Sequence, residues 1–113
     1  MKLTDSNVTI MTNDMNKSIS FYESLGLTLK QRWGDNYAMM SGPGITLGIH
    51  PNDGGKVSSG SVSIGFMVDD FEAVRKMLKK NKIKFKEDDG KSGTYANFKD
   101  PDGTALYFVL PKW

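Results

Sequence analysis

The sequence has 113 residues, 38% hydrophobic and 25% charged, which is ordinary for one globular domain with a modest core. Its net charge of +2 excludes the strong basic excess of a nucleic-acid-binding protein, and no apolar run is long enough to span a membrane. The absence of cysteine excludes disulfides, thiol catalysis and cysteine metal sites. Because the N-terminus (MKLTDSNVTI) also lacks an apolar signal core, we expect a cytoplasmic protein that forms a single domain over residues 1–113.

The first half of the chain predicts a strand, a helix and three further strands. Residues 7–14 (NVTIMTND) are a short apolar run that ends in an acidic residue, and a helical pattern follows over residues 15–27. Asp14 is placed to cap this helix and Gly26 to end it. The three strands that follow are predicted at residues 27–32, 36–41 and 44–50.

The second half repeats this pattern. A Gly/Ser-rich linker at residues 52–60 (NDGGKVSSG) joins a module at 1–51 to a module at 61–113. Residues 63–70 (SIGFMVDD) align with residues 7–14, so that Met67 matches Met11 and Asp70 matches Asp14. A helix is predicted at residues 70–81, ended by Asn81, and strands at 61–68, 83–87, 93–99 and 104–110.

Lysines are concentrated in residues 76–86 (KMLKKNKIKFK), where the second helix is predicted to end and a strand to begin. Such a run is typical of a solvated helix face and the strand after it, which is the interpretation we favour. A patch that binds a polyanion is the alternative.

Alternation along the strands divides their side chains between two faces of a sheet. Large apolar rows, such as Val8 with Ile10 and Ile64 with Phe66, are expected to lie under the helices. The other face is small, polar or thioether: Asn7, Thr9, Met11, Thr46, Gly48, His50, Ser63, Gly65, Met67, Ala105, Tyr107 and Val109. Because its small residues leave volume, this face predicts a concave surface for a small ligand, and packing against another sheet is the alternative.

Three stretches of the chain, NDMNKSISFYESLGL (13–27), VDDFEAVRKMLKKNKI (68–83) and FKDPDGTALYFVL (98–110), carry a family resemblance. Together they resemble the vicinal oxygen chelate superfamily, which includes glyoxalase I, extradiol dioxygenases, fosfomycin-resistance enzymes and bleomycin-resistance proteins. The resemblance implies an α+β fold in which two βαβββ modules form an open cup-shaped sheet. Neither half can bury both faces of its sheet alone, so the modules are expected to pack together or to pair across a homodimer.

In the metal enzymes of this family, the ligands lie at the start of the first strand and in the middle of the fourth strand of each module. The resemblance maps these positions onto Asn7, Gly48, Ser63 and Tyr107, with Thr46 as an alternative register to Gly48. None of these residues is His, Asp or Glu, the donors that a divalent metal prefers. We therefore expect no metal and no cofactor at these positions.

Aromatic residues and one histidine lie near the predicted cup face. His50 is expected to be a rim residue with a hydrogen bond, and a general acid or base is the alternative. Trp33 and Tyr37 flank a turn, where they can stack on a flat ligand or pack within the hairpin or a dimer interface. The methionines Met11, Met39, Met40 and Met67 are interpreted equally as a soft lining and as core filling.

The prediction is a metal-free small-molecule-binding protein resembling bleomycin-resistance proteins, acting in antibiotic resistance of that kind by sequestering a neutral or aromatic organic ligand. The expected ligand-binding residues are Asn7, Thr9, Met11, Trp33, Gly48, His50, Ser63, Met67 and Tyr107. No catalytic residue is identified, and no nucleic-acid or membrane partner is expected. The alternatives are a glyoxalase-type lyase, isomerase or transferase with an atypical metal site, and an interaction module whose cup is filled.

Overall fold

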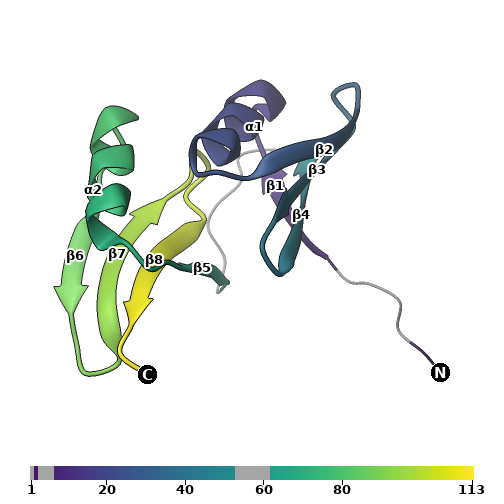
Figure 1. Ribbon diagram of the computed structural model, residues 1–113. Helices are drawn as coiled ribbons and strands as arrows, with labels where there is room; N and C mark the ends of the chain where they lie inside the picture. The colour runs from purple at the N-terminus through teal and green to yellow at the C-terminus, as the bar shows by residue number, and fades with distance from the viewer. Residues whose placement is uncertain (1, 3–6, 53–61) are drawn as a thin grey trace. The chain divides into compact units, whose positions relative to one another are not determined.

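A computed structural model describes residue 2, residues 7–52 and residues 62–113, and Figure 1 shows their course. The chain divides into two compact units, Met1–Val57 and Ser58–Trp113, which are described separately below. The predicted linker at 52–60 lies outside the described residues except for Asn52. In the described part, no helix has the length and apolar character needed to cross a membrane.

Both units have the predicted order of strand, helix and three strands, and this confirms the α+β fold. Unit 1 contains β1 (Val8–Thr12), α1 (Met15–Ser24), β2 (Thr28–Trp33), β3 (Tyr37–Gly42) and β4 (Ile45–Pro51). Unit 2 contains β5 (Ser63–Met67), α2 (Phe71–Lys80), β6 (Lys86–Asp89), β7 (Gly93–Lys99) and β8 (Ala105–Pro111). The largest error is at β6, because the N–H of Ile83 bonds the Leu78 carbonyl and closes the helix instead of starting the strand.

Each unit forms a four-stranded sheet with the same topology. The strand order is β1-β4-β3-β2 in unit 1 (sheet A) and β5-β8-β7-β6 in unit 2 (sheet B). The β1–β4 and β5–β8 pairs are parallel, and the remaining pairs are antiparallel. One helix covers one face of each sheet, and we call the opposite face the open face (Figure 1). Strands β1 and β5 are therefore equivalent edge strands.

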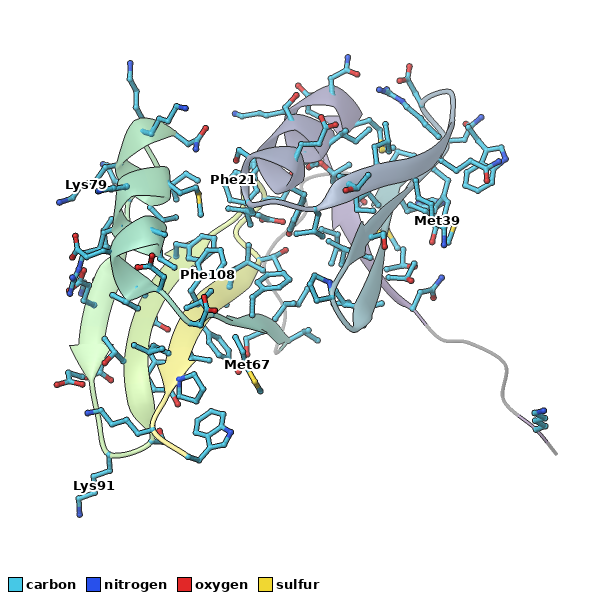
Figure 2. All side chains as sticks on the ribbon, viewed as in Figure 1. Phe21, Met39, Met67, Lys79, Lys91 and Phe108 are labelled. Atoms are coloured by element: carbon cyan, nitrogen blue, oxygen red, sulfur yellow. The ribbon has the colours of Figure 1, made fainter. Side chains whose placement is uncertain are left out.

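The apolar core of each unit lies between its helix and its sheet. In unit 1, Tyr22 of α1 and Leu47 and Ile49 of β4 have no exposed surface. In unit 2, Leu78 of α2 is equally buried, and Phe108 lies between β8 and α2 (Figure 2). Burial of each such side chain stabilises the fold by about 1.5–3 kcal/mol. The helix sides of β4 and β8 are therefore large and apolar.

Two residues lie on their predicted faces but have an unexpected exposure. Val8, expected under a helix, is 40% exposed because it begins the edge strand β1. Val109, expected on the open face, is only 2% exposed. Its methyl carbon lies 2.9 Å from the point where a side chain on Gly93 would begin, so it fills the space that this glycine leaves on β7.

Most of the lysine run is solvated, and one arginine beside it ties α2 to β6. Lys79 is exposed and points away from the unit in Figure 2. Arg75 donates two hydrogen bonds to Glu87 of β6, at 2.5 and 3.2 Å, and a third bond to Glu72. The bond from Arg75 holds the pKa of the Glu87 carboxyl below its usual value.

Both helices begin as predicted. The Asp14 carboxylate accepts a hydrogen bond from the backbone N–H of Lys17 at 3.1 Å. The Asp70 carboxylate accepts the equivalent bond from Ala73 at 3.2 Å. Each bond satisfies one of the backbone donors left free at a helix start.

Both helices also end with one shared motif, in which the residue after the cap is left-handed. Gly26 has this conformation after α1 with φ +106°, and Lys82 has it after α2 with φ +56°. Asn81 ends α2 as predicted, but Lys82 and not Asn81 has the left-handed conformation that Gly26 has after α1. Asn81 is the preceding cap, and its side-chain amide donates to the Met77 carbonyl at 2.9 Å. A lysine thus stands where the repeat has glycine.

We expect the substitution Lys82→Gly to stabilise the protein. A side chain in the left-handed conformation costs about 1–2 kcal/mol. The extra freedom of glycine in the unfolded chain costs about 0.4–1 kcal/mol, so the free energy of unfolding should rise by about 1 kcal/mol in denaturant titrations. Lys82→Ala is the matched control, because it removes the charge and keeps the strain. An equal gain in that control would contradict the explanation.

Candidate functional site

The open face of sheet A carries a row of large side chains that crosses all of its strands. This aromatic row consists of Trp33, Tyr37, His50 and Met11, one residue from each strand. The register pairs Trp33 with Tyr37 and Met11 with His50. Ring centroids lie 5.7 Å apart for Trp33 and Tyr37, and 6.4 Å apart for Tyr37 and His50. The row is therefore one continuous surface.

A β-bulge places Trp33 on this face. Leu29 of β2 lies opposite Met40, which is fully buried on the helix side of the sheet. Strict alternation from Leu29 would put Trp33 on the helix side as well. The register shift between Leu29 and Gln31 inserts Lys30 and reverses the side. As a result, Trp33 is on the open face and is 44% exposed.

The phenol of Tyr37, which belongs to the aromatic row, lies over a glycine. A side chain on Gly48 would begin 2.0 Å from the Tyr37 hydroxyl oxygen and 2.7 Å from the Thr9 hydroxyl oxygen. The two hydroxyl oxygens are themselves 3.2 Å apart and share a hydrogen bond. The phenol thus occupies the space above Gly48 and is held there by Thr9.

Sheet B also has a tyrosine ring over a glycine, but here the glycine is on the edge strand β5 and the tyrosine is on β8. A side chain on Gly65 would begin 2.1 Å from the ring of Tyr107, which is the register partner of Gly65. The ring centroid of Tyr95 lies 5.7 Å from that of Tyr107, and the Tyr95 hydroxyl bonds Ser92 at 2.8 Å. Within the described residues, the Tyr107 hydroxyl makes no hydrogen bond. It is a half-exposed polar group without a protein partner there.

The four positions mapped from the metal enzymes hold no strong metal donor. Gly48 pairs with Thr9 and Tyr107 pairs with Gly65, so the register puts Gly48 and Tyr107 at equivalent places in the repeat. Asn7 and Ser63 are exposed at the starts of their strands. Among the described residues, no three His, Cys, Asp or Glu side chains gather closely enough to hold a metal ion.

His50 is held at the end of β4. Its Nδ1 lies 2.6 Å from the carbonyl oxygen of Pro51. Since a carbonyl only accepts hydrogen bonds, Nδ1 carries the proton. In the described part of the chain, no carboxylate bonds the ring, so an acid–base pair is absent there. The hydrogen bond that we expected for His50 is therefore present.

The methionines divide between the core and the open faces. Met40 is fully buried and fills the core. Met39 lies on the side of sheet A that faces away from α1, and Met67 points away from α2 (Figure 2). Met11 and Met67, which match in the repeat, are 45% and 71% exposed. Core filling is therefore confirmed for Met40, and a soft lining stays a prediction for Met11, Met39 and Met67.

A separate cavity of about 320 Å³ lies at the end of β1 that leads into α1. Its lining residues are Thr12, Asn13, Asp14, Met15, Asn16, Asp35, Pro51 and Asn52. Asp14 caps the helix, and Asp35 forms an ion pair with Arg32 at 2.8 Å. None of the predicted ligand-binding residues lines this cavity, so it does not belong to the open-face site.

The sequence alone did not identify Tyr37, Tyr95 and Gly65 as members of one arrangement. A glycine inside a strand signals that something approaches the backbone closely, and Gly48 and Gly65 both gave that signal. The groups that approach these glycines are the phenols of Tyr37 and Tyr107, each from the neighbouring strand. That pairing requires the register, which the sequence does not state.

Comparison with known proteins gives a consistent picture. Residues 6–108 match the family described as the glyoxalase/bleomycin resistance protein/dioxygenase superfamily. A solved bleomycin-binding protein complexed with bleomycin has 19% identity and a TM-score of 0.75, over 97% of this chain and 100% of that one. A fosfomycin resistance protein from Listeria monocytogenes has 17% identity and a TM-score of 0.81, over 99% and 96%. At these identities the structural likeness shows the fold.

One curated relative from Mycolicibacterium smegmatis, described as an uncharacterized protein, is 33% identical over 76 residues. The match covers 63% of this chain and 60% of the relative. The chain therefore matches about three fifths of that protein's length.

We expect Gly48→Ala to displace Tyr37. The new methyl group would overlap the phenol, so the Tyr37–Thr9 bond should break and the free energy of unfolding should fall by about 1 kcal/mol. In a Trp113→Phe background, Trp33 is the remaining tryptophan, and its emission should change as Tyr37 moves. Gly42→Ala is the matched control, because its new methyl group would meet its neighbours at 3.4 Å. An unchanged Trp33 spectrum in Gly48→Ala would refute the arrangement.

Proposed function

The chain belongs to the glyoxalase/bleomycin resistance protein/dioxygenase superfamily, and we propose that it binds a small organic molecule on the open faces of its sheets without a divalent metal ion. One observation carries this proposal. At the equivalent positions Gly48 and Tyr107, phenol rings occupy the space beside the backbone, and neither position offers an imidazole or a carboxylate. A phenol and a glycine are poor ligands for the divalent ions that such sites hold.

The ligand is proposed to be neutral, and aromatic or amphiphilic. The residues that cross the open face of sheet A in the aromatic row and beside it carry indole, phenol, imidazole, thioether, amide and hydroxyl groups. Such a surface suits an uncharged compound, because burying an unpaired ligand charge against it would be costly. The structural neighbour that holds bleomycin supports sequestration as the mode of action. We place this activity in the cytoplasm, in keeping with a sequence that lacks cysteine.

Tyr107 is proposed to supply the polar contact. The hydroxyls of Tyr37 and Tyr95 have protein partners, Thr9 and Ser92. The Tyr107 hydroxyl has none in the described part, and its ring is held over Gly65. It is therefore available to donate a hydrogen bond to an oxygen or nitrogen of the ligand, where the metal enzymes would use a metal ion.

The edge strands support a homodimer. The exposed large hydrophobic side chains in the described part are Val8, Met11, Trp33, Val62, Met67 and Trp113. Four of these six lie on β1 or β5 or directly before β5. Unpaired strand edges with apolar side chains tend to pair with another strand. We propose that these edges meet those of a second copy.

The first test of the proposed function combines metal analysis with a ligand screen. Protein purified without chelator, and again after incubation with nickel, zinc and manganese, should contain no stoichiometric metal. In a thermal-shift screen, neutral aromatic or amphiphilic compounds should raise the melting temperature. Stoichiometric metal, with hits among metal ions alone, would overturn the proposal.

For any ligand found in this screen, Tyr107→Phe should weaken binding about fivefold, in line with the loss of one hydrogen bond. Tyr95→Phe is the matched control, because its hydroxyl is already bonded to Ser92 and should not affect affinity. Isothermal titration gives both values. Equal losses in the two variants would remove Tyr107 from the site.

The dimer is tested by light scattering. The wild-type mass should be that of two chains, and Met67→Lys on the β5 edge should shift it toward one chain because a charge disfavours edge pairing. Ser20→Lys, at an exposed position of α1, is the control and should stay dimeric. A monomeric wild type would contradict the homodimer.

A further inference from the structure

The two open faces are built on one register, and they differ in chemistry. In sheet A the aromatic row reads Trp33, Tyr37, His50 and Met11 from β2 to β1. The equivalent row of sheet B reads Asp88, Tyr95, Val109 and Met67. Sheet A therefore has an indole and an imidazole where sheet B has a carboxylate and a buried valine.

We propose that the open face of sheet A recognises a flat, uncharged ring system, which stacks on Trp33 and Tyr37, and that the open face of sheet B does not share this role. The inference rests on the proposed function, and it names the class of ligand and the unit that binds its ring system. It is carried by the asymmetry between the two rows, by the fixed positions of the rings in sheet A, and by the charges around them.

The rings of sheet A are held in place before any ligand binds. Tyr37 is fixed by the Thr9 hydroxyl, by the bare backbone of Gly48 and by ring contacts on both sides. His50 is fixed by the Pro51 carbonyl. Aromatic side chains that are already ordered lose little conformational entropy on binding, so their surface contributes most of its contact energy to affinity.

Trp33 is the exposed end of this surface. The bulge at Lys30 turns it to the open face, and its register partner Tyr37 supports it on one side. With 44% of its surface exposed, the indole offers a face to a partner. Offset stacking of a second ring on such a face is favourable beyond the area it buries.

Two charged residues beside Trp33 are paired with each other. Asp35, in the turn after Trp33, pairs with Arg32 at 2.8 Å. The Arg32 Nε also donates to the Gly34 carbonyl at 2.7 Å. Arg32 lies opposite Ala38 and so points to the helix side of the sheet. None of the four residues of the aromatic row is an Asp, Glu, Lys or Arg, which favours an uncharged ring system.

The test uses N-phenylnaphthylamine, a flat neutral dye whose emission rises in apolar sites, with the full-length Trp113→Phe protein. Saturable binding is expected, with energy transfer from Trp33. Trp33→Leu should weaken the dye affinity at least about tenfold, and Tyr37→Phe, which keeps the ring and loses the Thr9 bond, about two- to threefold. Tyr95→Leu in sheet B is the matched control and should change the affinity less than about twofold. Circular dichroism checks that each variant is folded.

Anilinonaphthalene sulfonate carries the same rings with a negative charge, and it should bind more weakly than the neutral dye. Equal or tighter binding of the sulfonate would overturn the inference of an uncharged ligand. Equal losses in Trp33→Leu and Tyr95→Leu, or saturable dye binding that Trp33→Leu leaves unchanged, would overturn the division between the sheets while the proposed function stands. If neither dye binds but other compounds raise the melting temperature, this inference alone fails. If no compound binds at all, the proposed function fails with it.

Discussion

The open faces depend on one steric constraint: a phenol ring can lie against the sheet only where the backbone carries no side chain. Any Cβ at Gly48 or Gly65 would lie within about 2 Å of a tyrosine atom, far inside van der Waals contact. Glycine therefore sets where the rings lie, and the rings set what space remains above the sheet. The hydrogen bond between Tyr37 and Thr9 and the position of the Tyr107 ring over Gly65 both follow from this packing.

The same constraint bears on metal chemistry. A metal centre needs converging donors and room for the ion beside the strands. In unit 1 the Tyr37 phenol occupies the space above Gly48. In unit 2 the Tyr107 ring packs over Gly65. Restoring a site would therefore require more than a histidine or glutamate at one position. In unit 1 the Tyr37 phenol would also have to leave the space above Gly48, and with it the contact between Tyr37 and Trp33.

Local chemistry allowed much of the fold to be predicted from the sequence. The caps Asp14 and Asp70 were predicted because capping depends on a side chain and the three residues after it. The left-handed residue Lys82 was missed because this position after a helix usually carries glycine, and a lysine gives no such signal. The contact of Tyr37 with Gly48 was missed because it depends on strand register and on a rotamer. Periodicity fixes a face, and it does not say which neighbour a long side chain will cover.

The repeat separates what the fold requires from what it leaves free. Along β4 and β8, the helix-side positions stay large and apolar: Leu47 matches Leu106, and Ile49 matches Phe108. The alternate positions change completely, since Gly48 matches Tyr107 and His50 matches Val109. One backbone register carries both sets, so stability of the fold does not explain the differences on the open face. Differences that the fold does not require are the ones that selection on binding can use, and they are concentrated on the surface where the ligand is proposed to lie.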